Sequence, residues 1–163
     1  MAGLAGHVRL ALVFASANRL HYRNPHERKT TVTSMFVSLP VSDLERAKAF
    51  YTALGFSINP PSADTNAARV VVEDDHSYLM LMARDFFQSQ SDRPIGDPAT
   101  TLTSATLIFL DSREAVDAAL AAGLAAGGSE ARPAADYGFL YQRQLTDPDG
   151  HVLEFGHMEA DAD

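Results

Sequence analysis

Two stretches of this chain, 68 residues apart, carry the same order of local sequence features. Each begins with an apolar strand pattern and continues with an acidic residue, a helical pattern and a glycine. Asp43 and Gly55 in the first copy correspond to Asp111 and Gly123 in the second, and both pairs are separated by twelve residues. An internal repeat of this kind is one supersecondary unit used twice. Together with the strands that follow each helix, it predicts an α+β fold of two βαβββ modules.

The first module is predicted over residues 35–91. Its opening strand alternates side chains between two faces, and Ser42 and Glu45 then form a capping box that starts a helix. Gly55 is expected to end this helix. Further short strands are expected at 56–58, 68–73 and 78–83.

The second module is predicted over residues 101–158, after a polar linker. A strand at 104–110 precedes a helix at 112–122 that Gly123 is expected to stop. Glycines and Pro133 then mark loops before the next strand. The module ends in a β-hairpin.

This hairpin is the sequence LTDPDGHVLEF. Pro148 fixes φ for the first central position of a type I turn, and Gly150 accepts the left-handed backbone that follows. In the strand after the turn, Leu153 and Phe155 point to one face and Glu154 to the other. If the two apolar residues face the core, Glu154 is either a site residue or a solvated strand residue.

Charge and cysteine content exclude several classes of protein. Residues 35–163 carry eight Lys/Arg and twenty Asp/Glu, and such an acidic body disfavours nucleic-acid binding. The chain has no cysteine, which excludes disulfides, thiolate zinc sites and cysteine nucleophiles. No apolar run approaches the roughly 18 residues that span a bilayer. We expect a cytoplasmic protein with neither a nucleic-acid nor a membrane partner.

The two ends of the chain differ from its body. Residues 1–34 carry five Lys/Arg and one Glu and are expected to be a disordered or non-native extension, with Met35 as the natural first residue. A targeting peptide is the alternative, although the apolar run is short for one. Residues 159–163 form an acidic tail.

Two motifs carry a resemblance to a known group of proteins. VSDLERAKAFYTALGF at 41–56 and DPDGHVLEF at 147–155 resemble the vicinal oxygen chelate superfamily. That group contains glyoxalase I, bleomycin-resistance and fosfomycin-resistance proteins, and extradiol dioxygenases. The resemblance covers 35–158 and implies a single domain whose tandem modules curl a mixed sheet around a cleft. It also implies a homodimer.

The same resemblance bears on metal binding. In metal-dependent members each module supplies two ligands, one from its first strand and one from its last, and these positions fall on Phe36, Met80, Ser104 and Glu154. Only Glu154 can ligate a divalent ion strongly. No cofactor is therefore expected, and a divalent metal held through other residues is the alternative.

Without a metal, the enclosed face predicts an apolar and aromatic small-molecule pocket with a few polar groups. Its expected lining around Glu154 is Phe36, Ser38, Tyr78, Met80, Met82, Ser104 and Thr106. Arg143 is a further candidate, because the sequence leaves its face of the sheet open. The alternative is that these side chains simply fill the sheet interior. Phe86 and Phe87 are expected to form either a lid or a helical cap over the core.

Two functions follow. The first is a metal-free binding module resembling the bleomycin-resistance branch, which holds a small organic molecule with Glu154 as anionic anchor. The second is an enzyme, either a glyoxalase-like lyase or isomerase or an extradiol-dioxygenase-like protein, which depends on a metal or uses Glu154 as general base. We expect the first, and the sequence alone leaves open whether the protein is catalytic.

Overall fold

The computed structural model describes residues 33–59, 65–74 and 76–159. The extension predicted over 1–34 lies outside these ranges except for its last two residues, and the acidic tail lies outside them beyond Glu159. No helix within the described ranges is both long and apolar enough to cross a membrane.

The chain divides into two compact units, which are described separately. The first comprises residues up to 44 and 56–95, and the second comprises 45–55 and 96 onward. Each unit contains one four-stranded sheet.

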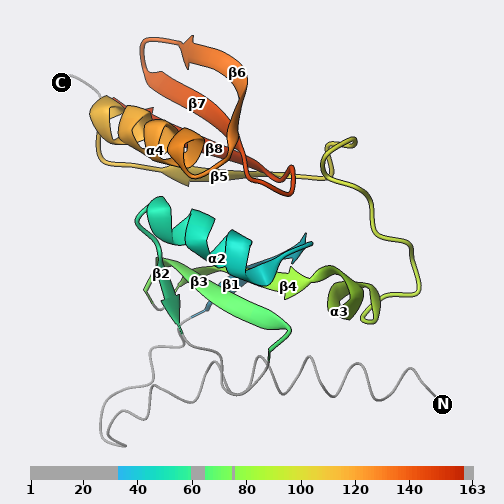
Figure 1. The fold of residues 1–163 in the computed structure, drawn as a ribbon. Coiled ribbons are helices and arrows are strands. Elements are labelled where there is room, and N and C mark those ends of the chain that lie inside the picture. The colour runs from blue at the N-terminus through green and yellow to red at the C-terminus, as the bar shows by residue number, and fades with distance from the viewer. Residues whose placement is uncertain (1–32, 60–64, 75, 160–163) are drawn as a thin grey trace, which may run out of the picture. The chain divides into compact units, whose positions relative to one another are not determined.

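The first sheet has the strand order β1-β4-β3-β2 (Figure 1). β1 runs parallel to β4, and the other neighbouring strands run antiparallel. β4 is buried along most of its length, and the short helix α3 follows it directly. The elements of this unit are β1 (Met35–Val41), β2 (Ser57–Asn59), β3 (Ala67–Glu73), β4 (Ser77–Ala83) and α3 (Arg84–Gln88).

The second sheet has the order β5-β8-β7-β6, which is the order of the first sheet with each strand replaced by its repeat counterpart. β5 runs parallel to β8, as β1 does to β4. The matching topology confirms the predicted α+β fold of two βαβββ modules. The elements of this unit are α2 (Leu44–Ala53), β5 (Ala105–Phe109), α4 (Arg113–Ala125), β6 (Ser129–Asp136), β7 (Leu140–Thr146) and β8 (Val152–Met158).

The core of the second unit lies between α4 and its sheet (Figure 1). Val116 of the helix and Leu145, Leu153 and Phe155 of the strands are fully buried. Full burial of each such side chain is worth about 1.5–3 kcal/mol. A Cβ on Gly123 would lie 2.2 Å from Leu145 Cδ2, so this glycine lets the helix approach β7 closely.

Both ends of α4 differ from the prediction. The N-cap is Ser112, whose side chain accepts a hydrogen bond of 3.1 Å from the Ala115 N–H. The helix continues past Gly123, which is needed for packing rather than as a stop, and ends at Ala125. The left-handed glycine after the helix is Gly127, with a φ of 96°.

The region around Pro133, predicted as a loop, is the edge strand β6. Proline cannot donate to a strand ladder and is tolerated at a sheet edge. The pairing of β6 with β7 shifts in register between Arg132 and Ala135, on either side of this proline. An interrupted edge of this kind disfavours pairing with a further strand.

The helix α2 joins the second unit through the DPDG turn between β7 and β8. Tyr51 donates a hydrogen bond of 3.0 Å to Asp147 Oδ2, and Arg46 pairs with Asp149 at 3.2 Å. Asp147 is only 4% exposed, and its Oδ1 also accepts the backbone N–H groups of Asp149 and His151 at 2.9 and 2.8 Å. These bonds fix the turn and hold α2 against it.

Candidate binding site on the second sheet

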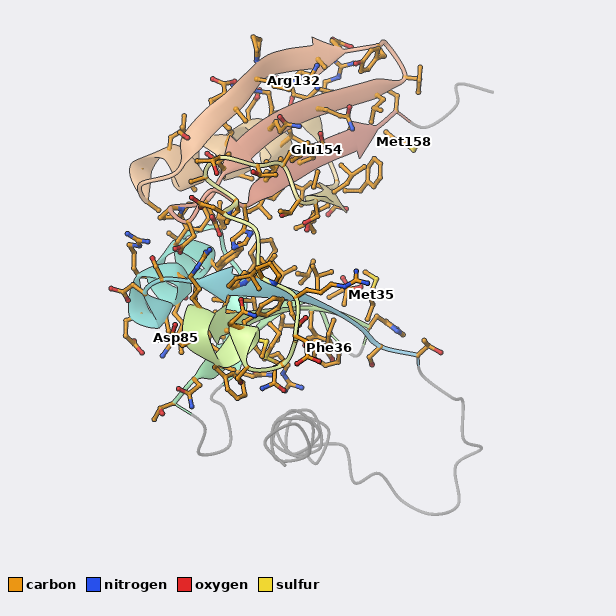
Figure 2. All side chains as sticks on the ribbon, turned by 90° about the vertical axis from the view of Figure 1, so that its right-hand side faces the viewer. Met35, Phe36, Asp85, Arg132, Glu154 and Met158 are labelled. Carbon is orange, nitrogen blue, oxygen red and sulfur yellow. The ribbon has the colours of Figure 1, made fainter. Side chains whose placement is uncertain are left out.

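Glu154 lies on the face of the second sheet that points away from α4. Leu153 and Phe155, its neighbours on β8, are buried in the core under the helix. Side chains alternate along a strand, so Glu154 and Met158 share the opposite face. Figure 2 shows Glu154 in the middle of this strand and Met158 at its end.

The pairing register identifies the neighbours of Glu154. Leu107 of β5 lies beside it on one side and Gln144 of β7 on the other. Two residues further along β8, Phe109 lies beside Gly156. We call this surface the Glu154 face and define it by Leu107, Phe109, Gln144, Glu154, Gly156 and Met158.

The Glu154 face combines one carboxylate with exposed apolar side chains. Gln144 Nε2 donates a hydrogen bond of 2.5 Å to Glu154 Oε1. Leu107 is 41%, Phe109 51% and Met158 57% exposed. Apolar groups in this number around a polar centre are typical of ligand sites.

Glu154 lacks the arginine partner that five other carboxylates of its unit have. Within the described residues it forms no ion pair, and its hydrogen-bond partner is a neutral amide. The carboxylates of the unit that do pair with an arginine are Asp117, Glu130, Asp136, Asp149 and Glu159. A carboxylate without a cation beside it is available to a ligand that supplies one.

Three residues predicted to lie near Glu154 are placed elsewhere. Ser104 is exposed and precedes β5. Thr106 pairs with Leu153, so it shares the face that α4 covers. Arg143 also lies on that face, where it pairs with Asp117 of α4 at 2.6 Å and with a β6 carboxylate at 2.9 Å.

The predicted residues of the first module do share one face of the first sheet. Phe36 pairs with Tyr78 in the register, and their rings stack with centroids 4.8 Å apart (Figure 2 labels Phe36). Ser38 pairs with Met80, and Met82 lies one alternation further along β4. The five residues are therefore neighbours on this face.

Part of this face is filled. Met80 and Met82 are each 1% exposed and pack with Ala67 and with Phe86 of α3. Phe87 packs against the same cluster. The aromatic pair thus forms a helical cap, and the two methionines match the alternative in which they fill the interior of the sheet.

The side chains of the Glu154 face do not fit a divalent metal, because they include a single carboxylate. On β5 the residues that share the Glu154 face are Ala105, Leu107 and Phe109, none of which has a donor side chain. His157 lies on the α4 side, with Nδ1 2.9 Å from the Leu110 carbonyl oxygen. In the part of the chain that the structure describes, no three His, Cys, Asp or Glu side chains are grouped to hold a metal ion.

Sequence reasoning missed the apolar part of the Glu154 face. Leu107 and Phe109 come to lie near Glu154 only through the parallel pairing of β5 with β8, and Met158 shares its face through the alternation along β8. A parallel register between residues 47 apart in the chain has no turn to fix it, unlike a hairpin. The glycine at position 156 was the available indication, because a glycine within a strand often marks a close approach.

Comparison with known proteins supports the fold. Residues 33–72 match the family described as bleomycin resistance protein-like N-terminal. No curated protein shows significant similarity in sequence.

Solved structures with the same fold include three that illustrate its range. A hypothetical protein, SA1046, from S. aureus has a TM-score of 0.67 at 25% identity, covering 76% of this chain and 92% of its own. A glyoxalase/bleomycin resistance protein from Albidiferax ferrireducens has a TM-score of 0.57 at 26% identity, and the match covers 76% of this chain and 97% of its own. TnmS3, an antibiotic binding protein from Streptomyces sp. CB03234, has a TM-score of 0.56 at 23% identity, and the match covers 77% of this chain and 95% of its own. With its two βαβββ modules, the chain has the fold of the vicinal oxygen chelate superfamily, and its N-terminal segment is similar to that of bleomycin-resistance proteins.

Proposed function

We propose that this chain is a small-molecule binding protein, similar to bleomycin-resistance proteins, which holds its ligand on the Glu154 face without a tightly bound metal. The observation that supports this most strongly is a carboxylate with only a neutral amide partner, surrounded by half-exposed apolar side chains. A ligand that covers these side chains removes apolar surface from water, and one that carries an N–H group or a positive charge satisfies Glu154.

The acidic body of the chain supports a ligand with positive charge, because it raises the local concentration of cations. One neighbour in fold, TnmS3, is named as an antibiotic binding protein, so antibiotics are the first compounds to test. The proposal includes a cytoplasmic location, in keeping with the lack of cysteine.

Ligand binding is tested by thermal shift with a panel of antibiotics that includes bleomycin. At least one compound should raise the melting temperature of the wild-type chain, and Glu154→Gln should remove that increase. Glu73→Gln is the matched control, because Glu73 is an exposed strand residue of the other sheet. An increase that survives Glu154→Gln would contradict the proposed site.

Protein purified without chelators should contain much less than one equivalent of divalent metal, because the Glu154 face offers one carboxylate and one neutral amide. Elemental analysis of the wild-type chain and of Glu154→Ala measures this. A stoichiometric metal that disappears in the variant would contradict the expectation. Turnover of a hemithioacetal or a catechol by such protein would make a glyoxalase-like lyase or a dioxygenase the better description.

We also propose that the chain forms a homodimer. The exposed aromatic residues Tyr137 and Phe139, in the turn between β6 and β7, support a protein contact because such groups are enriched at interfaces. Arg113 holds this turn through ion pairs with Asp136 and Glu159. Light scattering should return twice the mass of one chain, and the mass of a monomer would contradict the proposal.

A further inference from the structure

We infer that the Glu154 face takes a flat organic cation, whose ring stacks on Phe109 while its charged or N–H-bearing edge meets the carboxylate of Glu154. This inference rests on the proposed function and names the class of ligand for the same site. Three features support the inference. They are the packing of the Phe109 ring on Gly156, the distance between this ring and the Glu154 carboxylate, and the lack of an ion-pair partner for Glu154 in the described residues.

The ring of Phe109 lies against the backbone of Gly156. A Cβ at position 156 would meet Phe109 Cε1 at 3.2 Å and Leu107 Cδ1 at 3.4 Å. Gly156 is not among the glycines with positive φ, so its backbone does not require a glycine. Glycine weakens a strand, and its presence here is explained by the close approach of the two side chains.

Packed in this way, the Phe109 ring is still accessible to a ligand. One side of the ring rests on β8, yet the residue is 51% exposed. An aromatic ring supported in this way loses little freedom when another ring packs on it, because its position is already set. Phe109 is therefore a preformed platform for a flat group.

The carboxylate lies at a suitable distance from this platform. Phe109 pairs with Gly156, and Glu154 is two residues earlier on the same face of β8. Neighbouring strands lie about 4.8 Å apart and residues two apart in a strand about 6.6 Å, so the two positions are about 8 Å apart diagonally. A fused ring system with an amino or ammonium group at its edge spans this distance.

The charge of Glu154 selects the cation. Gln144 occupies Oε1, and the carboxylate has no ion-pair partner in the described residues. A flat neutral molecule would cover Phe109 but leave the negative charge without a partner. A compact ammonium ion would meet the charge but leave the apolar side chains exposed to water.

The test is fluorescence titration of the full chain with proflavine, a flat cation. Acridone serves as the flat neutral probe, and tetraethylammonium serves as a competing cation that is not flat. Proflavine should bind about tenfold more tightly than acridone. Phe109→Leu and Gly156→Ala should each weaken proflavine about fivefold, the first by removing the aromatic ring and the second by displacing it. Glu154→Gln should abolish the preference for proflavine over acridone.

Two control variants should leave proflavine binding unchanged. Gly96→Ala places a Cβ 3.1 Å from Thr103 Cγ2, a similar crowding at a position of ordinary φ away from the Glu154 face. Leu124→Ala removes another exposed apolar side chain from the same unit, on α4. Circular dichroism establishes that each variant is folded at the temperature of the titration.

Specific outcomes overturn the inference. Equal affinity for proflavine and acridone, or proflavine affinity unchanged in both Phe109→Leu and Gly156→Ala, would exclude a flat cation as the ligand class. Displacement of proflavine by tetraethylammonium at equal concentration would do the same. If proflavine fails to bind while an antibiotic still depends on Glu154, the proposed function stands and the flat-cation class is wrong. If the antibiotic response is independent of Glu154, the proposed function itself fails.

Discussion

Gly150→Ala is expected to destabilise the chain by about 2–5 kcal/mol, for two reasons that add. Gly150 has a φ of 94°, in the left-handed region where a Cβ costs about 1–2 kcal/mol. A Cβ there would also lie 2.6 Å from the backbone N and Cα of Ala99. Backbone atoms cannot turn aside as a side chain can, so the turn or the linker must move. Urea unfolding of the wild-type and variant chains measures the difference.

Gly127→Ala is the matched control for this prediction. Gly127 has nearly the same φ, 96°, but a Cβ there would meet no atom within 4 Å. Its cost should be limited to the left-handed backbone, about 1–2 kcal/mol. The two variants should therefore differ by about 1–3 kcal/mol, the contribution of overpacking. Equal losses of stability would show that the contact between the DPDG turn and the linker is not rigid.

Tyr51→Phe should cost about 1.5–3 kcal/mol of stability at a pH where Asp147 is ionised, the typical contribution of a hydrogen bond to a charged group. The hydroxyl of Tyr51 donates to a carboxylate that is almost completely buried. Burial and the negative charge of Asp147 raise the pKa of Tyr51, which keeps the hydroxyl protonated as a donor. Phenylalanine has the same ring, so the variant removes the hydrogen bond with little change in packing.

The same contact should make stability depend on pH. Burial raises the pKa of Asp147 above its ordinary value of 3.8, although the charge of His151 and the hydrogen bonds to the carboxylate oppose the shift. Because the folded-state pKa is the higher one, the contribution of Asp147 is complete below about 3.8 and falls as pH rises through the folded pKa. Asp147→Asn cannot ionise, so its stability relative to wild type should increase from about pH 4 to about pH 7.

Urea unfolding at several pH values checks both variants. The loss caused by Tyr51→Phe should be larger above the folded-state pKa of Asp147, where the carboxylate is ionised, than below it. Lys48→Met serves as the control, since the partly exposed Lys48 lies on the same helix and, within the described residues, forms an ion pair only with its near neighbour Glu45. A Tyr51→Phe loss that does not change with pH would show that the hydroxyl does not interact with an ionised Asp147.

The fold was predictable because both repeats carry the same local sequence signals for strand, helix and turn. The alternation in β1, the DPDG turn and the left-handed Gly150 each appear in the structure as the sequence indicated. The predictions were wrong at a glycine and a proline, because each of these residues is compatible with more than one kind of local structure. Gly123 packs against Leu145 instead of ending α4, and Pro133 occupies an edge strand instead of a loop.

The candidate site was predictable only in part, because its residues meet through long-range pairing. The faces of Glu154 and Leu153 followed from alternation along one strand. The face of Arg143 could not be predicted in this way, because both faces of β7 carry polar residues over most of the strand. Thr106 was placed on the wrong side by a shift of one residue, which moves a side chain to the opposite face.

The position of α2 limits where this chain can be divided into parts. Its sequence belongs to the first repeat, yet its buried Tyr51 is bonded to the turn of the second. A break in the linker near residue 96 would therefore separate this helix from its hydrogen-bonding partner. Production of either half alone would therefore leave Tyr51 or Asp147 without the partner of its hydrogen bond.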